Sequence, residues 1–293
     1  MSSLQNSVLR LIFPQWQGGV NPPYYLGAQM LNWLAPETEG PVEEVDVPEP
    51  TGEEVLTEEN GIKALKQLRA QQEDARVRIE RHQPESIVVL GGDCLVDLAP
   101  FAYLNERYDG DLAVLWIDAH PDIMTSEQFS HAHAMVLGCL LGKGEAAFAD
   151  FVKQPVKSEN LCYVGVNEPT KWEADAMQNM ALQNVSPEDI AENGALPVLD
   201  WFASTGAKHL AIHFDLDALD PQQFRALLFA QPDAAPDAFE GIAQGKLSIA
   251  QVVSIIKAVS EKANIVGLGI TEHLPWDALA MQKMLSELPL LKK

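Results

Sequence analysis

The chain has 293 residues, 47% of them hydrophobic, and a formal net charge of −22 at pH 7. This charge disfavours binding to nucleic acids, whereas a cationic small molecule would be attracted. No apolar run approaches the ~20 residues of a membrane-spanning helix, and the start lacks the pattern of a secretory signal, so we expect no membrane contact and a cytoplasmic location. The length permits a sizeable core, and we expect a single domain over residues 1–293.

The first part of the chain alternates between strand and helix patterns. Strands are predicted over residues 8–13, 42–47, 86–90 and 112–117, and helices over residues 24–34, 57–81 and 95–108. The helix over 57–81 is predicted from Thr57 as its cap and from apolar residues at helical spacing. The segment 14–23 is rich in glycine and proline, which exclude regular structure. It could cover a site or pack on the surface, and we favour surface packing.

The second part continues the alternation. Strands are predicted over residues 160–166, 182–185, 209–215 and 265–271, and helices up to residue 141, from about residue 169, and over 197–204, 248–259 and 276–288. Residues 222–246 are irregular, and we expect a long excursion near a functional site. About eight strands alternating with helices predict a mainly parallel α/β sheet that helices cover on both faces.

Metal-ligand side chains follow two of the buried strands. Asp118, His120 and Asp122 come directly after one strand, and Asp215 and Asp217 end another. Residues two apart in an extended chain lie on the same face, so these side chains converge. Four carboxylates this close would repel one another unless a cation lay between them. Oxygen ligands with one imidazole suit manganese or a similar divalent ion.

Two more strands end in polar segments, Gly91-Gly92-Asp93-Cys94 and Thr271-Glu272. Ligands of open parallel sheets bind beyond the carboxyl ends of the strands, where all four segments would lie. Each segment alone could be a helix cap or a turn. Their occurrence together favours one site. The other cysteines, Cys139 and Cys162, lie in apolar runs and are predicted core thiols.

These residues, in this order, resemble the arginase, or ureohydrolase, family, which includes agmatinase and formimidoylglutamase. The similarity runs from about residue 87 to residue 272, and its most specific parts are Asp118-Ala-His-Pro-Asp122 and Asp215-Leu-Asp-Ala-Leu-Asp-Pro221. The resemblance implies a three-layer α/β/α sandwich with a parallel sheet of eight strands. It also implies two manganese ions bridged by water, a small cationic guanidino or amidino substrate, and a trimer or hexamer.

The resemblance also assigns roles to single residues. It implies that the metal ligands are Cys94, Asp118, His120, Asp122, Asp215 and Asp217, with Asp118 and Asp215 as the bridging ligands. By the same resemblance His133 is a proton shuttle, and Glu272 receives the guanidinium. Asp122 would also hold the attacking hydroxide, which the metals generate by lowering the pKa of water.

The chain departs from the family pattern at several positions. Cys94 stands where the family usually has an imidazole ligand, and a thiolate favours zinc or iron over manganese. His213 stands where the family tends to have serine, and residues 125–130 and 165–168 differ from the arginase residues that recognise an amino-acid head group, which disfavours arginine as substrate. Three alternatives stay open: a neutral Cys94 thiol beside a single metal, a binding or regulatory protein without catalysis, and a metal hydrolase of another amine-derived substrate.

Overall fold

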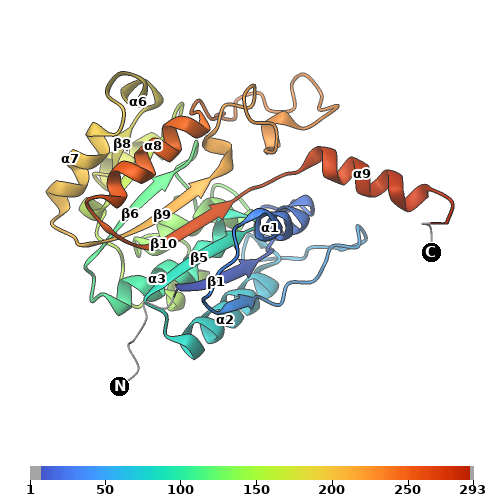
Figure 1. Cartoon of the computed structure of the whole chain (residues 1–293), viewed down its shortest axis with the longest axis horizontal. Coiled ribbons are helices and arrows are strands. Elements are labelled where there is room, and N and C mark those ends of the chain that lie inside the picture. The colour runs from blue at the N-terminus through green and yellow to red at the C-terminus, as the bar shows by residue number, and fades with distance from the viewer. Residues whose placement is uncertain (1–7, 291–293) are drawn as a thin grey trace.

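The computed structural model describes residues 8–290, which contain an eight-stranded sheet with strand order β2-β1-β5-β10-β9-β6-β7-β8 (Figure 1). All neighbouring strands of this sheet are parallel. The strands are β1 (Val8–Phe13), β2 (Val42–Glu44), β5 (Ser86–Gly91), β6 (Leu112–Ile117), β7 (Leu161–Val164), β8 (Gln183–Val185), β9 (His209–Asp215) and β10 (Asn264–Thr271). The predicted sheet of eight parallel strands is confirmed.

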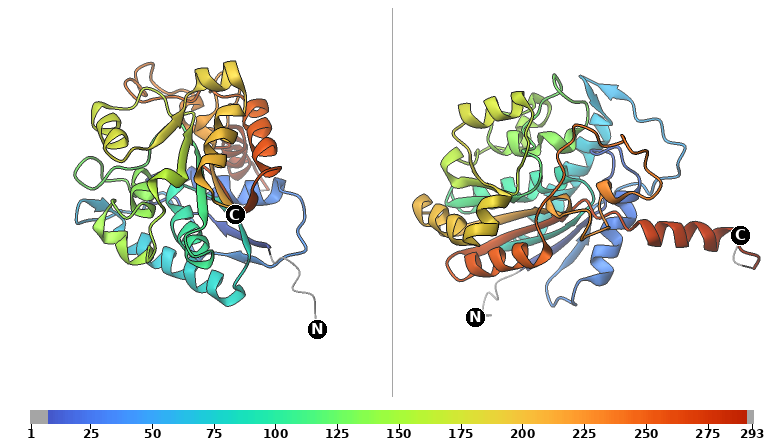
Figure 2. Two further views of the ribbon diagram at one scale, coloured as in Figure 1. Left: turned by 90° about the vertical axis from the view of Figure 1, so that its left-hand side faces the viewer. Right: turned by 90° about the horizontal axis from the view of Figure 1, so that it is seen from above.

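Helices cover both faces of the sheet, so the predicted three layers are confirmed as well (Figure 2). The helices are α1 (Pro23–Leu34), α2 (Leu65–His82), α3 (Leu98–Arg107), α4 (Val136–Leu140), α5 (Lys171–Asn179), α6 (Pro187–Asn193), α7 (Leu196–Thr205), α8 (Ile249–Ser260) and α9 (Trp276–Glu287). One apolar core packs α2, α3 and α4 against the sheet, and a second packs α6, α7 and α8 against the other face.

Strand β6 shows how the sequence divides between these two cores. All six of its residues are buried, as expected of a central strand with helices on both sides. Successive side chains point to opposite faces. Val114 and Trp116 therefore join the first core, and Leu115 and Ile117 join the second.

One local prediction was wrong, and one helix was missed. The helix predicted from Thr57 begins only at Leu65, because the preceding residues form a hairpin of β3 (Glu58–Glu59) and β4 (Ile62–Lys63). Asn60 and Gly61 both have positive φ, 54° and 77°, which is the conformation that an Asn-Gly hairpin turn requires. Helix α6 was not predicted. Ser186 caps it in a reciprocal hydrogen-bond pair with Asp189.

Helix α9 stands away from the body of the molecule (Figures 1 and 2). None of its residues is buried, and Met281, Met284 and Leu285 are exposed. Across residues 8–290, every helix is too short or too polar to cross a bilayer.

Candidate metal centre

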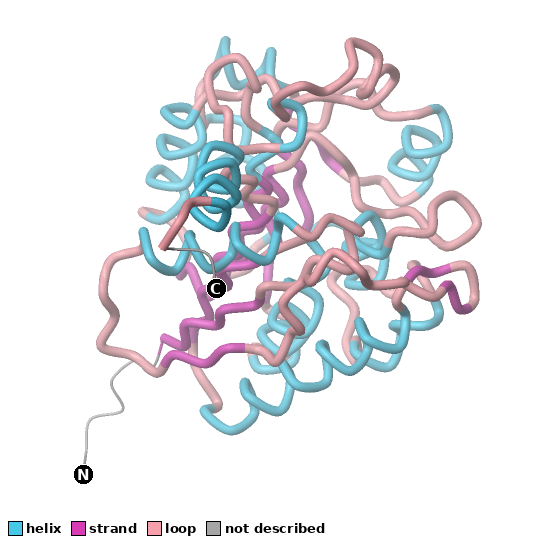
Figure 3. Tube along the Cα trace, turned by 90° about the vertical axis from the view of Figure 1, so that its right-hand side faces the viewer, coloured by secondary structure: helices cyan, strands magenta, loops and turns pink. Residues whose placement is uncertain are grey.

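The predicted ligand residues come together at the carboxyl edge of four adjacent strands, β5, β10, β9 and β6. Figure 3 looks toward this edge, where the loops that follow the strands gather. Cys94 follows β5, Asp118 follows β6, Asp215 ends β9, and Glu272 follows β10. The parallel topology therefore brings residues that are up to 178 positions apart, Cys94 and Glu272, into contact.

Donor atoms within 4.8 Å of one another form overlapping clusters. One cluster contains Cys94, Asp118, His213 and Asp215, and a second contains Cys94, His133 and Glu272. The other two contain Asp118, His120 and Asp217, and Asp215, Asp217 and Glu272. Asp118 and Asp215 each belong to two clusters, as bridging ligands would, and so do Cys94, Asp217 and Glu272. Asp122 is buried beside these clusters but belongs to none of them.

Local hydrogen bonds hold the two bridging candidates in place. The backbone N–H of His120 donates to Asp118 Oδ1 over 2.7 Å, and that of Asp217 donates to Asp215 Oδ1, also over 2.7 Å. Each aspartate thus folds back on the residue two positions later, a common turn for this side chain. Trp116 Nε1 donates to the other oxygen, Oδ2, of Asp118.

His120 is oriented by the long irregular segment over residues 222–246. Its Nε2 lies 3.1 Å from the carbonyl oxygen of Ala243, and its Nδ1 lies 3.1 Å from Asp217 Oδ2. A carbonyl can only accept, so Nε2 carries the proton, and Nδ1 is free to bind a metal in the neutral ring. The predicted excursion near the site is thus confirmed.

Lysine and arginine side chains of the described residues do not pair with the carboxylates of the centre. Within residues 8–290, no lysine or arginine forms an ion pair with Asp118, Asp122, Asp215, Asp217 or Glu272. Burial raises the pKa of Asp215 and Asp122, and the neighbouring carboxylates raise it further. A nearby cation would favour loss of a proton from either group.

Several buried polar atoms in the centre lack a hydrogen-bond partner among the described residues. They are Asp122 Oδ2, Asp217 Oδ1 and His213 Nε2. Buried polar groups are normally paired, because an unpaired one costs about 1–3 kcal/mol. Lone pairs from carboxylate, imidazole and thiol groups around one space are the donors that a divalent metal takes. The residues present fit a pair of divalent ions.

His133 and Glu272 form the substrate-facing part of the centre. His133 Nδ1 lies 2.9 Å from Glu272 Oε1. Burial lowers the pKa of His133, but the hydrogen bond and charge of Glu272 outweigh it, and the pKa is raised. Nε2 of His131, two residues earlier, lies 3.4 Å from the Lys63 amine, and mainly burial lowers the pKa of His131 to about 4.

Two of the carboxylate residues adopt an unusual backbone conformation. Asp122 and Glu272 have φ of 52° and 61°. Residues with side chains seldom occupy this left-handed region, and such strain collects at functional sites. Glu272 directly follows β10, and Asp122 lies in the loop after β6, where the chain changes direction at the carboxyl edge of the sheet.

The segment over residues 14–23 also reaches the centre, so the predicted surface packing was wrong. Gln15 and Trp16 are buried. The backbone N–H of Gly19 donates to Asp93, and the carbonyl of Gly18 accepts from the backbone of His133. Gly92 is needed here because a Cβ on it would lie 1.8 Å from the Gln15 carbonyl oxygen.

Tyr24, Asp97 and His213 were not predicted as parts of the site. Tyr24 is buried at the start of α1, and burial, together with the charges of Glu272 and Asp215, raises its pKa. Its only sequence signal was an aromatic residue after a Pro-Pro step, which is equally typical of core packing. Asp97 and His213 form a buried pair.

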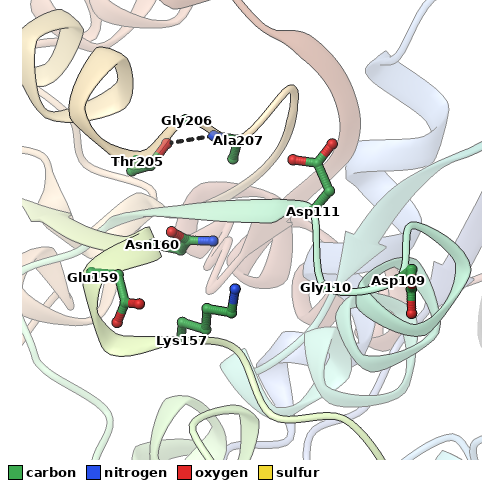
Figure 4. A pocket seen from close by; sticks show the side chains of 9 residues that line it. All are labelled: Asp109, Gly110, Asp111, Lys157, Glu159, Asn160, Thr205, Gly206 and Ala207. Carbon is green, nitrogen blue, oxygen red and sulfur yellow. Dashed lines mark hydrogen bonds between the residues drawn. The ribbon is translucent and has the colours of Figure 1, made fainter.

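A surface hollow of about 280 Å³ lies elsewhere, near the amino ends of β6 and β7 (Figure 4). Its lining residues are Asp109, Gly110, Asp111, Lys157, Glu159, Asn160, Thr205, Gly206 and Ala207. They lack the imidazole and thiol donors of the centre, and the chemistry of this chain is concentrated at the opposite edge of the sheet.

Comparison with known proteins agrees with this geometry. The model of the arginase family matches residues 44–279. The arginase of Staphylococcus aureus (strain MRSA252) is 26% identical over 140 residues, 46% of this chain and 46% of that protein. The aligned part thus spans about half the length of this curated relative.

Solved structures share the fold. The arginase of Entamoeba histolytica, crystallised with L-ornithine, superposes with a TM-score of 0.77 at 18% identity and 92% coverage of both chains. Formimidoylglutamase of Bacillus subtilis gives a TM-score of 0.65 at 14% identity, covering 92% of this chain and 79% of that one. With the family model matched over most of its length, the chain belongs to the arginase family.

Proposed function

We propose that this chain is a metal-dependent hydrolase that cleaves a linear carbon–nitrogen bond of a guanidino or amidino compound. The observation that carries the proposal is the set of overlapping donor clusters that share Asp118 and Asp215, with Glu272 at their border. When bound, a pair of divalent ions would supply Lewis acidity and a nucleophilic water near neutral pH. The ligands of the two ions would be Cys94, Asp118, His120, Asp122, Asp215 and Asp217.

Three side chains would act on the substrate and the attacking water. Glu272 supplies a buried negative charge for the planar cation of the substrate. Asp122 Oδ2, which lacks a partner in the described chain, can accept a hydrogen bond from the attacking water and orient it. His133 uses Nδ1 to contact Glu272, which leaves Nε2 to protonate the departing amine.

The electrostatics favour a cationic substrate. The chain carries a net charge of −22, and the carboxylates of the centre lack lysine or arginine partners among residues 8–290. Part of this charge would be neutralised by the metals, and Glu272 would remain for the substrate. The arginase of Entamoeba histolytica was crystallised with L-ornithine, a small amine. Agmatine, guanidinobutyrate and formimidoylglutamate are the first compounds to test, and arginine is the reference.

One observation favours the alternative of a protein that binds without catalysing. Cys94 Sγ lies 2.8 Å from Asp215 Oδ2 and donates a hydrogen bond to it. Burial and the surrounding carboxylates raise the pKa of this thiol. A neutral thiol is a poor metal ligand, and a chain that kept it neutral would hold one ion instead of two.

The test is an assay of purified protein after loading with Mn²⁺, Zn²⁺ or Fe²⁺. Release of urea, ammonia or formamide from one of the amidino compounds is expected. Absence of all three products with every metal, in protein shown to bind metal, would favour the non-catalytic alternative. The single domain over residues 1–293, the trimer or hexamer and the cytoplasmic location remain predictions, which light scattering and cell fractionation would test.

A further inference from the structure

His213 lies inside the sheet, at the border of the metal centre. It is a residue of β9, paired in register with Trp116 of β6 on one side and with Gly269 of β10 on the other. Its side chain is completely buried. An ionisable side chain in the middle of a central strand normally costs stability, because this position usually holds an aliphatic residue.

Neighbouring side chains fix the imidazole in one orientation. Its Nδ1 lies 2.7 Å from Oδ2 of Asp97, which is also completely buried. The Trp116 ring stacks on it at a centroid distance of 3.6 Å and an interplanar angle of 9°. The absence of a side chain at Gly269 makes room for this pair, since a Cβ there would lie 1.8 Å from Asp97 Oδ2.

The other ring nitrogen faces the metal centre. With Nδ1 donating to the Asp97 carboxylate, Nε2 of a neutral imidazole carries a free lone pair. Nε2 lies 3.9 Å from Asp118 Oδ2 and has no hydrogen-bond partner among the described residues. Two donor atoms that share an ion at roughly 2.0–2.3 Å are about 3–4.6 Å apart. His213 forms a cluster within 4.8 Å with Cys94, Asp118 and Asp215.

From this geometry we propose that His213 Nε2 is a ligand of the metal that Cys94, Asp118 and Asp215 surround, and that Asp97 is the residue that positions it. The proposal rests on the metal-dependent function proposed above and specifies the ligands of one of its two ions. The imidazole of that ion would come from β9 instead of from the turn after β5 that carries Cys94.

The donor set explains why Asp97 is buried without a lysine or arginine. A carboxylate behind a metal-bound histidine holds the ring in the correct tautomer and increases the basicity of its free nitrogen. Thiolate, imidazole and carboxylate donors together select zinc or iron over manganese. The cluster of Asp118, His120 and Asp217 has no sulfur donor, so its oxygen ligands and single imidazole still favour manganese or a similar ion.

A purely structural role for His213 is the competing explanation, and His209 provides the matched control. His209 lies on the same strand, stacks on Tyr108 at 3.8 Å and 17°, and places Nδ1 3.0 Å from the Asp111 carbonyl oxygen. It therefore has the same kind of packing and hydrogen bonding, but at the end of β9 remote from the donor clusters.

The first experiment counts metal-bound imidazoles in the wild-type chain, so it does not depend on a variant that folds. Protein labelled with ¹⁵N-histidine and loaded with ¹¹³Cd²⁺ should show cadmium–nitrogen couplings for two histidines, assigned to His120 and His213. A coupling to His120 alone, or to no histidine, would overturn the proposal.

The second experiment compares His213→Ser, Asp97→Asn and His209→Ser after loading with Co²⁺ or Zn²⁺. We expect His213→Ser to bind one ion at least 100-fold more weakly and to change the visible absorption of the cobalt protein. Asp97→Asn should weaken the same ion about 10–100-fold, and His209→Ser should change neither readout. Added imidazole should restore the ion in His213→Gly.

An unchanged metal count, affinity and cobalt spectrum in His213→Ser would disprove the ligand role. These readouts do not require turnover. A chain with two cadmium-bound histidines that hydrolyses no amidine would contradict the proposed function and leave this inference standing. A chain that hydrolyses an amidine, but in which His120 is the only histidine bound to cadmium, would support the proposed function and contradict this inference.

Discussion

Carboxylates occur in two opposite surroundings in this molecule. Glu43 of β2, at the edge of the sheet, accepts from Arg78, Arg81 and His82 of α2 at 2.7–3.0 Å. The hydrogen bond from His82, followed by the arginine contacts, lowers its pKa. Asp215 of the metal centre has no lysine or arginine partner among residues 8–290, and burial, followed by the charges of the neighbouring carboxylates, raises its pKa.

The difference shows which charges the chain neutralises by itself. At Glu43 the positive partners all come from the end of one helix, α2, and the ion pairs join α2 to the sheet. At the centre no lysine or arginine of the described chain pairs with the carboxylates, and we propose that metal ions supply positive charge. The two regions should therefore respond in opposite ways when a carboxylate is removed.

Replacement of a bridging carboxylate should have the largest effect. Asp215→Asn should abolish high-affinity metal loading, because both ions lose a ligand. In metal-free protein, at a pH high enough to ionise Asp215, the same change should raise the free energy of unfolding on the order of 1–4 kcal/mol, the Coulomb energy of two like charges about 4 Å apart. Metal analysis and denaturant titration measure the two effects, with Asp220→Asn as the control. Full metal content, or a less stable metal-free variant, would contradict the assignment.

His133 separates catalysis from metal binding. His133→Asn should lower turnover by roughly 10²–10⁴-fold, the usual range for loss of a general acid. Metal content should stay at the wild-type value, since His133 contacts Glu272 and is proposed to lie outside the ligand set. Steady-state kinetics with metal analysis on the same sample distinguish the two. Loss of a metal ion from His133→Asn would instead indicate that His133 is a metal ligand.

Chelation tests the dependence of the fold on external charge. With free metal at about a thousand times its dissociation constant, the ion-bound chain should be about 4 kcal/mol more stable than the chelated one. Thermal unfolding with and without EDTA measures this difference. The same treatment of Asp215→Asn should change its melting temperature little. An equal response of both proteins would indicate that the ions stabilise some other site.

The thiol donor should affect which metal is preferred. If Cys94 binds as a thiolate, Cys94→His should shift the preference toward Mn²⁺, because an imidazole is a harder ligand. We expect a change of roughly tenfold or more in the ratio of Mn²⁺ to Zn²⁺ affinity. Competition titrations give this ratio. If wild type and Cys94→His have the same affinity ratio and the same number of bound metals, Cys94 is a neutral thiol that packs in the core and binds no metal.

Glu43 should give the smallest effect, of the opposite sign to Asp215. Glu43→Gln should lower the free energy of unfolding by less than about 1 kcal/mol, because its partners are partly exposed. Its pKa is lowered on folding, so its contribution is present above the ordinary value of 4.5 and is lost as the pH falls through the lowered value. Urea titrations at several pH values, with Glu58→Gln as control, would reveal this. If the pH dependence of stability is the same in Glu43→Gln and wild type, the ion pairs of Glu43 do not stabilise the fold.

The sequence was informative where local pattern and topology agree. A buried strand followed by alternating aspartates fixes both the position and the direction of Asp118 and Asp215, because parallel strands end at one edge. The sheet and the residues at its strand ends were predicted almost entirely from this pattern and from the rule that parallel strands end at one edge. The hairpin at Asn60 and Gly61 had a readable signal as well, but the helical spacing that follows it was extended too far.

The remaining parts depend on contacts between distant segments. His213 lies within a strand, where alternation alone predicts core packing, and only the structure shows Asp97 behind it, 116 positions away in the sequence. The approach of residues 14–23 to Asp93 and the carbonyl of Ala243 on His120 are backbone contacts, which side-chain patterns do not encode. Asp122, placed among the ligands by resemblance, stays a prediction because it joins none of the clusters.

The projecting α9 has a consequence for how the chain would degrade. A helix of 12 residues without buried side chains has little tertiary stabilisation, and isolated helices of this length are marginal in water. It is attached at its start, where Trp276 Nε1 donates to the Leu227 carbonyl. Amide hydrogens beyond this attachment should exchange with solvent much faster than those of α8, and a protease should trim the helix first. The clipped chain should still carry the whole carboxyl edge of the sheet.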